Sequence, residues 1–141
     1  LSRSSAASDV YKRQVITPHE GELRSILPNL KGNCIDKALK AASELNCIVV
    51  LKGATTVIAS PDNKAIVNCA GAKWLATAGS GDVLAGIICG TLSNKMDSFL
   101  ASAFSVWMHS EIGNYLGPGL VAEDIPENIN LIYKKLLKTN I

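Results

Sequence analysis

The sequence feature that most constrains the fold is the uninterrupted apolar run Cys47–Leu51. A strand with one face in water alternates apolar and polar residues, whereas this run is apolar at every position and rich in β-branched side chains. In the segment just before it, residues 35–46, apolar residues recur at helical spacing and charged residues occupy the other face. We therefore expect an amphipathic helix that leads into a central parallel strand covered on both faces.

A second strand is predicted at Val15–Ile16, directly before Thr17-Pro18-His19-Glu20. In this tetrapeptide Thr17 is predicted to cap a helix, Pro18 to occupy its first position and Glu20 to complete a capping box. The helix is expected to end before Pro28, because proline disfavours the helical conformation in the residue before it.

The rest of the chain is predicted to form a hairpin and three helices. Two short apolar runs on either side of Pro61-Asp62-Asn63 indicate two strands joined by a turn. Helical spacing and helix stop signals predict helices over residues 82–92, 98–116 and 124–137. This order of elements predicts an α/β fold with helices layered on both faces of a partly parallel sheet.

Composition narrows the possible partners and the compartment. The formal net charge is +2, and Lys and Arg are scattered, which argues against nucleic acid or anionic membrane as a partner. No apolar run approaches the roughly 18 residues that a membrane helix needs. The four cysteines, none of them in a CxxC pair, are predicted to be buried reduced thiols, so we expect a soluble cytoplasmic protein with a small ligand: Cys34, Cys47, Cys69 and Cys89.

Residues 1–14 differ from the rest of the chain. They are rich in Ser and Ala, end in Tyr-Lys-Arg-Gln, and show neither alternation nor helical periodicity. We interpret them as a foreign segment resembling a translated sequencing adaptor, or alternatively as a native disordered tail. Residues 15–141 are then the part of the chain that folds.

A glycine-rich loop, Gly79-Ser80-Gly81-Asp82, opens the helix that follows the predicted hairpin. Two glycines let the backbone approach a phosphate closely, so the amides of residues 79–82 and the positive end of the helix can point at one oxyanion. An acidic residue is unfavourable beside a bound anion, so Asp82 is predicted to act as a catalytic base on an attacking hydroxyl. The alternative is purely structural: Ser80 or Asp82 caps the helix, and Gly86 and Gly90 allow close packing.

Three segments together resemble the NAD(P)H-hydrate dehydratases of the ribokinase-like superfamily. They are, in the order in which that family has them, Thr17-Pro18-His19-Glu20-Gly21-Glu22-Leu23, Leu51-Lys52-Gly53-Ala54-Thr55-Thr56, and residues 75–88 around Gly79-Ser80-Gly81-Asp82. The resemblance covers about residues 15–137. It implies the carboxyl-terminal part of a ribokinase-like layered sheet, with the amino-terminal part of the fold missing.

The resemblance also implies the reaction. These enzymes use ADP to phosphorylate the ring hydroxyl of hydrated NADH or NADPH; elimination of phosphate then restores NAD(P)H and leaves AMP. It implies Mg²⁺, ADP with ATP as a possible substitute, and a homo-oligomer when full length; metal ligands are not predicted. Because part of the fold is missing, we expect the isolated chain to have little activity.

The implied site residues map onto the three segments. Asp82 would be the catalytic base and a substrate contact, and His19 a second contact to the hydrated nucleotide. Gly79, Ser80 and Gly81 would form the anion hole. The AMP moiety would lie on Gly81 and on the turn after the central strand: Lys52, Gly53, Ala54, Thr55 and Thr56.

Some positions depart from the family or have plainer readings. The family usually has Pro where Glu20 stands, Thr at Ala70 and Asn at Ala72, so two polar groups are missing near the loop. His19 has the alternative of an exposed side chain beside a capping box, and Lys52 that of a solvated lysine at a strand end. Structural roles are expected for three further residues: Cys69, His109 as a packing residue in an apolar helix, and Asp124 as a helix cap.

Two other functions remain open at this point. A small-molecule kinase of the same superfamily, for example one acting on a vitamin precursor, would use the same glycine-rich loop. An inactive nucleotide-binding fragment would retain the loop without turnover.

Overall fold

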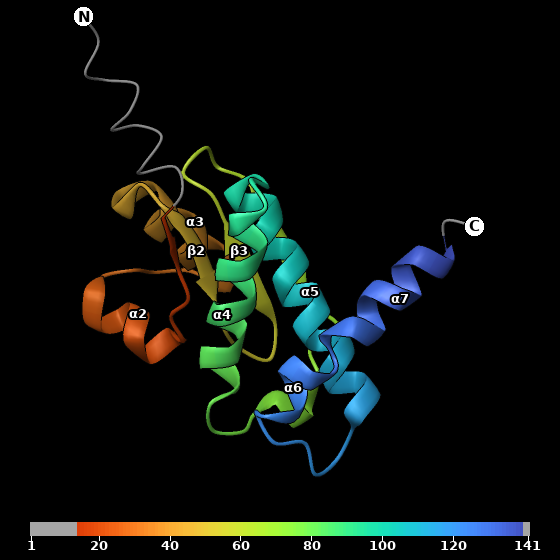
Figure 1. Cartoon of the computed structure of the whole chain (residues 1–141). Helices are drawn as coiled ribbons and strands as arrows, with labels where there is room; N and C mark the ends of the chain where they lie inside the picture. The colour runs from red at the N-terminus through yellow and green to blue at the C-terminus, as the bar shows by residue number, and fades with distance from the viewer. Residues whose placement is uncertain (1–13, 140–141) are drawn as a thin grey trace, which may run out of the picture.

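A four-stranded sheet forms the centre of the computed structural model, which describes residues 14–139 (Figure 1). Its strands lie in sequence order: β1 (Val15–Ile16), β2 (Ile48–Leu51), β3 (Thr56–Ala59) and β4 (Ala65–Asn68). β2 is parallel to β1 and antiparallel to β3, which pairs with β4 as a hairpin. The predicted interior strand and hairpin are confirmed, and β2 joins the parallel and antiparallel parts of the sheet.

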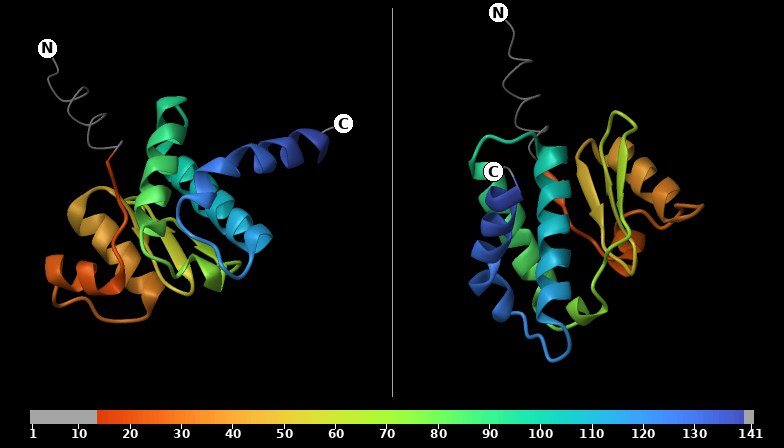
Figure 2. Two further views of the ribbon diagram at one scale, coloured as in Figure 1. Left: turned by 60° about the horizontal axis from the view of Figure 1, so that its bottom comes forward. Right: turned by 90° about the vertical axis from the view of Figure 1, so that its right-hand side faces the viewer.

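Helices cover both faces of this sheet, as predicted (Figure 2). On one face lie α2 (Glu20–Ile26) and α3 (Cys34–Leu45), and on the other α4 (Ser80–Ser93) and α5 (Ser98–Leu116). Successive side chains of β2 enter different cores: Val49 and Leu51 pack with α2 and α3, whereas Ile48 and Val50 pack with α4 and α5. A strand that feeds two cores has no position for a polar residue, which explains its continuous apolar sequence.

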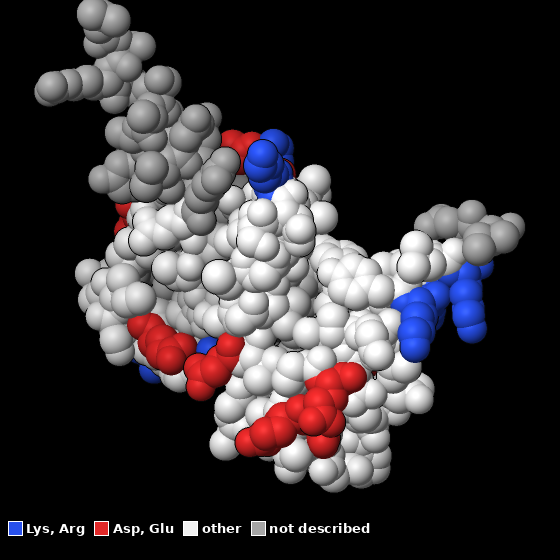
Figure 3. All heavy atoms as spheres, viewed as in Figure 1, with Lys and Arg blue, Asp and Glu red and all other residues white. Residues whose placement is uncertain are grey.

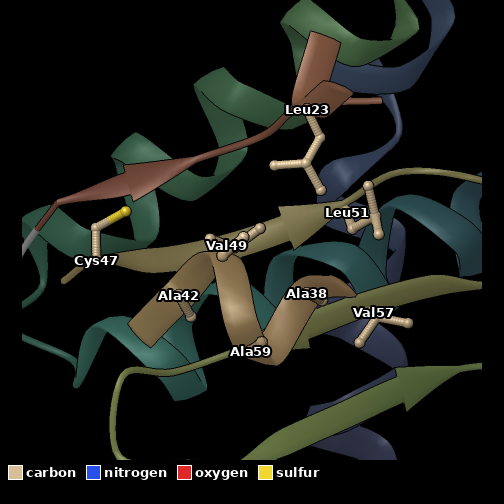
Figure 4. Close-up of a cluster of buried hydrophobic side chains, with 9 residues drawn as sticks. Leu23, Ala38, Ala42, Cys47, Val49, Leu51, Val57 and Ala59 are labelled. Atoms are coloured by element: carbon tan, nitrogen blue, oxygen red, sulfur yellow. The ribbon is translucent and has the colours of Figure 1, made fainter. Parts of the chain in front are cut away.

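The α3 side of the sheet is packed with small side chains (Figure 4). Ala38, Ala41 and Ala42 of α3 have no exposed surface. Alanine on the buried face lets the helix axis approach the strands closely, and Val57 and Ala59 of β3 fill the space beneath it.

The predicted start of α2 is wrong: the helix is capped by His19, not by Thr17. The His19 Nδ1 accepts a hydrogen bond from the Glu22 N–H at 3.1 Å, and the Glu22 Oε2 accepts one from the His19 N–H at 2.6 Å. The chain stays extended through Pro18, whose carbonyl accepts a hydrogen bond from the Lys52 N–H at 2.8 Å. Pairing with the end of β2 therefore delays the helix, which ends at Ile26, before Pro28 as predicted.

The predicted caps of α4 are also wrong. Its N-cap is Gly79, which has a φ of +83° and makes no side-chain hydrogen bond; Ser80 and Asp82 lie inside the first turn. Close packing does not explain Gly86 and Gly90 either, because a Cβ at either position would meet nothing within 4 Å. The left-handed cap explains Gly79, whereas neither capping nor packing explains Gly86 and Gly90.

α5 spans the predicted range, whereas the last predicted helix is divided into α6 (Asp124–Glu127) and α7 (Ile129–Thr139). The break lies at Asn128, whose side-chain Nδ2 donates to the Asp124 carbonyl at 2.7 Å while its N–H bonds to Ile125 instead. A side chain that takes the carbonyl of the residue four positions back interrupts the helical ladder. Asp124 is the first residue of α6 and not its cap, and its Oδ2 accepts from the Val121 N–H at 3.0 Å.

A third apolar cluster joins the outer faces of α4 and α5 to α6 and α7, and includes Met108, Ile112 and Ile125. A single 3₁₀ turn, η1 (Lys73–Leu75), lies between β4 and α4 and packs on α5. On the face shown in Figure 3, acidic side chains gather over α6 and basic ones over α7.

The cysteine prediction holds for one residue. Cys47 is buried, and burial raises the pKa of its thiol, but Cys34, Cys69 and Cys89 are exposed. Cys89 is exposed because the sheet-facing stripe of α4 runs through Leu84 and Ile88, one helical step away.

Residues 1–13 of the predicted tail lie outside the described part, and the Gln14 carbonyl accepts a hydrogen bond from the Ile48 N–H at 3.0 Å. Among the described residues, none of the helices has the length and hydropathy that a transmembrane span requires.

Candidate active site

One cavity of about 660 Å³ brings parts of all three sequence motifs together. It lies where β1 and β2, which are parallel, reach their carboxyl ends, the usual place for ligands in such sheets. Its polar side chains come from the start of α2, the turn after β2, η1, the start of α4 and the middle of α5: His19, Lys52, Thr56, Lys73, Ser80, His109 and Ser110. Gly53, Ala54 and Gly81 also line it, and residues separated by up to 91 positions therefore share one cavity.

The loop before α4 leaves backbone donors without partners. The Ser80 N–H donates to the Thr77 carbonyl at 3.3 Å, and the Asp82 N–H to the Gly79 carbonyl at 3.1 Å. The N–H groups of Gly79 and Gly81 donate to no group in the described part of the chain. With the positive end of the 14-residue helix α4 behind it, the Gly81 N–H can bind an anion in the cavity.

Lys52 lies over this loop. Its Nζ is 3.1 Å from the point where a Cβ on Gly81 would stand, and 3.8 Å from the Glu22 Oε2. A Cβ at position 81 would require the flexible end of the Lys52 side chain to shift by a few tenths of an ångström. A cation held against a free backbone donor makes the mouth of the loop attractive to phosphate.

Glu22 joins two of the predicted site residues, although its role was not predicted. It accepts from the His19 backbone and lies near both the His19 ring and the Lys52 ammonium, at 3.6 Å and 3.8 Å. The His19 N–H bond, and then the charge on Lys52, hold the pKa of the Glu22 carboxyl below its ordinary value. The sequence pattern predicted a capping box between Thr17 and Glu20, whereas the box in the structure is formed by His19 and Glu22.

His19 lines the cavity with 58% of its side chain exposed. Its Nδ1 is occupied by the Glu22 N–H, so Nε2 is the ring nitrogen that remains for a ligand. The exposed reading of the sequence and the substrate-contact reading are therefore compatible.

Asp82 is exposed in the first turn of α4, next to Gly81, and neither Asp82 nor the predicted anion-hole residue Gly79 is among the cavity-lining residues. Thr55 is also outside this cavity: it lines a second one of about 230 Å³ on the other side of the Lys52–Ala54 turn, together with Lys37 and Cys34. The structure thus brings together most of the predicted site residues, and the roles given to them remain predictions.

His109 is the main feature that the sequence interpretation missed. Its ring is 7% exposed, and its Nε2 lies 3.1 Å from both the Oγ and the carbonyl oxygen of Ser80. Burial lowers the pKa of the imidazole from 6.5 to about 4. Apolar neighbours such as Trp107 and Met108 led to the prediction of a packing role for His109. The sequence feature that indicates a polar environment is its place on the same helix face as Ser102 and Ser105.

The described residues contain no group of three or more His, Cys, Asp or Glu side chains that could hold a metal ion. Magnesium in nucleotide sites often keeps its waters and binds through phosphates with only one or two carboxylates. A magnesium ion would thus have to arrive with a nucleotide.

The fold is that of a ribokinase-like α/β protein, with a cavity at the carboxyl ends of β1 and β2. The crystal structure of the ADP/ATP-dependent NAD(P)H-hydrate dehydratase of Bacillus subtilis, co-crystallised with ATP and Mg²⁺, superposes with a TM-score of 0.80 at 29% identity, over 86% of this chain and 48% of that one. A ribokinase-like superfamily protein of Enterococcus faecalis gives a TM-score of 0.74 at 29% identity, over 88% of this chain and 45% of that one.

The chain belongs to the NAD(P)H-hydrate dehydratase family, whose model matches residues 1–129. The ADP-dependent (S)-NAD(P)H-hydrate dehydratase of Xanthomonas campestris is 33% identical over 131 residues, which are 86% of this chain and 45% of that protein. A bifunctional NAD(P)H-hydrate repair enzyme of Moorella thermoacetica is 38% identical over 104 residues, 71% of this chain and 20% of that protein. The chain thus spans about half the length of the single-function dehydratases it matches.

Proposed function

We propose that the protein to which this chain belongs is an ADP-dependent NAD(P)H-hydrate dehydratase that repairs hydrated NADH and NADPH. The observation that carries the proposal is the 660 Å³ cavity, in which His19, the turn after β2 and the loop before α4 face one space. Each comes from a different motif of the dehydratase pattern, and the family match is independent support.

The proposed reaction has two stages. Asp82 accepts the proton of the hydroxyl on the hydrated nicotinamide ring while that hydroxyl oxygen attacks the terminal phosphorus of ADP, and AMP leaves. The phosphate group of the resulting ester then departs with the carbon–oxygen electron pair, the neighbouring carbon loses a proton, and the ring double bond is restored. The sum is NAD(P)HX and ADP giving NAD(P)H, AMP and phosphate.

The residues that line the cavity would bind and orient the two substrates. The Lys52 ammonium and the N–H groups of Gly79 and Gly81 suit the charge on the transferring phosphoryl oxygens, with Ser80 beside them. Gly53, Ala54, Thr55 and Thr56 would hold the AMP moiety, and the His19 Nε2 would contact the hydrated nucleotide. Magnesium, when bound, would supply further charge neutralisation at the phosphates.

The decisive experiment is an assay for recovery of the dihydronicotinamide absorbance from NADHX in the presence of ADP, with AMP and phosphate measured in parallel. An Asp82→Asn change should lower the rate about 10²–10⁴-fold, since a positioned base contributes on this order. ADP affinity should remain, because Asp82 is not among the residues that line the cavity. The comparison is made in the full-length protein, where a rate within a few-fold of the unchanged protein would count against Asp82 as the base.

The assay also separates the alternatives. A vitamin-precursor kinase would yield a stable phosphorylated product and no recovery of NADH. Binding of ADP without turnover would identify a nucleotide-binding fragment, a candidate favoured by the position of Asp82 outside the cavity lining. The family resemblance also leads us to propose a cytoplasmic homo-oligomer for the whole protein, which gel filtration with light scattering would test.

A further inference from the structure

The contact between His109 and Ser80 joins the middle of α5 to the glycine-rich loop. Both side chains are buried, at 7% and 3% exposed, yet both residues line the 660 Å³ cavity. Two further hydrogen bonds hold the end of β4 and the residues after it on α5, where the Asn114 Nδ2 donates to the Ala70 carbonyl and the Asn68 Nδ2 to the Ser110 Oγ. His109 supplies the hydrogen-bond contact between α5 and the predicted anion hole.

The geometry fixes which ring nitrogen of His109 carries the hydrogen. Its Nε2 is 3.1 Å from the Ser80 carbonyl oxygen, which can only accept a hydrogen bond. An unprotonated Nε2 would place two lone pairs against each other, so Nε2 must be the N–H nitrogen. Because burial keeps the ring neutral, Nδ1 carries no hydrogen. Every buried side-chain nitrogen of the described residues has a hydrogen-bond partner, and Nδ1 has none, so Nδ1 must reach solvent through the cavity.

This tautomer determines what the Ser80 hydroxyl can do. The Ser80 Oγ is also 3.1 Å from Nε2, and because Nε2 is a donor, Oγ is the acceptor of that contact. The Ser80 Oγ makes no other hydrogen bond in the described part of the chain. The hydroxyl hydrogen therefore has no protein acceptor there and is left for a ligand in the cavity.

We infer that His109 is a positioning residue that makes the Ser80 hydroxyl a hydrogen-bond donor to an anionic phosphoryl oxygen bound beside Gly81. An anion fits this place because the neighbouring Gly81 N–H has no acceptor in the described part of the chain and the Lys52 ammonium lies over Gly81. The identity of the anion as a nucleotide phosphate rests on the proposed function. The orientation of Ser80 by His109 does not.

The first test is a long-range proton–nitrogen spectrum of the histidine rings in the free chain. The sequence contains only two histidines, so assignment needs one substitution, His19→Gln. We expect His109 as a neutral ring with hydrogen on Nε2 at neutral pH, and the same tautomer in Ser80→Ala, where the carbonyl contact persists. A hydrogen on Nδ1 would overturn the inference whatever the protein catalyses.

The second test measures the affinity for ADP and for inorganic phosphate by calorimetry. Ser80→Ala and His109→Phe should each weaken ADP binding about tenfold or more, as expected for loss of a hydrogen bond to a charged group. The double variant should be no weaker than either, because His109 acts on the ligand only through the Ser80 hydroxyl. His109→Gln should restore most of the affinity, since its amide N–H can replace Nε2–H.

Ser105→Ala is the matched control. The Ser105 Oγ lies 3.1 Å from the Thr91 Oγ1 and so also joins α4 to α5, but far from the loop. It should leave ADP affinity unchanged. If His109→Phe does not fold, Ser80→Ala, His109→Gln and the tautomer spectrum still decide.

The outcomes separate this inference from the proposed function. Unchanged ADP and phosphate affinity in Ser80→Ala would overturn it, as would a failure of the unchanged chain to bind either anion. ADP binding that depends on Ser80 and His109, without recovery of NADH, would support the inference and count against the dehydratase reaction.

Discussion

At the scale of single residues, the site depends on groups whose roles are set by burial and not by sequence pattern. His19 and His109 are both histidines on helices, yet the first caps a helix with more than half of its side chain in solvent and the second is buried against Ser80. The sequence motif around His19 identified that residue, whereas His109 lies in an apolar helix with no motif. The polar environment of His109 is formed only by the packing of α4 against α5.

The buried His109 should make stability depend on pH. Its pKa is about 4 in the folded state and 6.5 ordinarily, so between these values the unfolded chain binds more protons. Stability should therefore be full above pH 6.5 and fall as the pH drops toward 4, by up to about 3 kcal/mol. The measurement is urea unfolding as a function of pH.

His109→Gln is the control for this dependence. Other groups also titrate, among them the carboxyls of Glu20, Glu22 and Asp62, whose pKa values are lowered. Subtracting the variant's curve from that of the unchanged chain removes their contribution. Parallel curves from pH 6.5 to about 4 would show that His109 is not buried as described.

At the scale of elements, α5 supports the site by letting the segment before α4 approach closely. A Cβ on Gly113 would stand 2.7 Å from the Leu75 Cγ and 2.8 Å from the Ala72 Cβ. Real contacts of this kind do not occur, so η1 can pack on α5 only because position 113 is glycine. The same helix carries His109 one turn earlier, which links the packing of η1 to the position of Ser80.

Alanine substitutions at two helical glycines should have opposite effects. Gly113→Ala should destabilise the fold by about 1–3 kcal/mol through overpacking, and weaken ADP binding as η1 shifts. Gly86→Ala, on the exposed side of α4 with nothing within 4 Å, should stabilise it by about 0.5–1 kcal/mol. Thermal unfolding of both variants is the measurement; equal effects would contradict the packing described for α5.

At the scale of the whole molecule, two cores share one short sheet. Val49 and Val50 are adjacent in β2 and have no exposed surface, but one packs with α3 and the other with α4 and α5. If β2 left one of these cores, the apolar side chains of the other core would also be exposed to water. The described part of the chain should therefore unfold as one unit.

Val49→Ala tests this coupling. It should lower the free energy of unfolding by about 1–3 kcal/mol through a cavity under α3. Both tryptophans, Trp74 and Trp107, lie in the third cluster on the opposite side of the sheet. Their fluorescence midpoint in urea should shift together with the circular dichroism midpoint; a shift in only one signal would mean that the two sides unfold independently.

Much of the fold follows from local sequence, because strand β2, helix α3, the hairpin and α5 each carry a strong periodic or turn signal of their own. The helix starts do not. Thr17 has the chemistry of a cap, but pairing of Pro18 with Lys52 keeps it extended, and the Asn128 side chain divides a helix whose apolar period is continuous. Both outcomes depend on hydrogen bonds that local preference does not specify.

The sequence by itself determined the prediction of which segments carry the chemistry: the residues around His19, the turn after Lys52 and the loop Gly79-Ser80-Gly81-Asp82. Only the tertiary structure decided that Lys52 lies over Gly81, that Glu22 joins Lys52 to His19, and that His109 orients Ser80. The physical reason is range. Glycines and strand ends reveal a loop through backbone preferences acting over a few residues, whereas a shared cavity depends on packing between segments that are far apart in the chain.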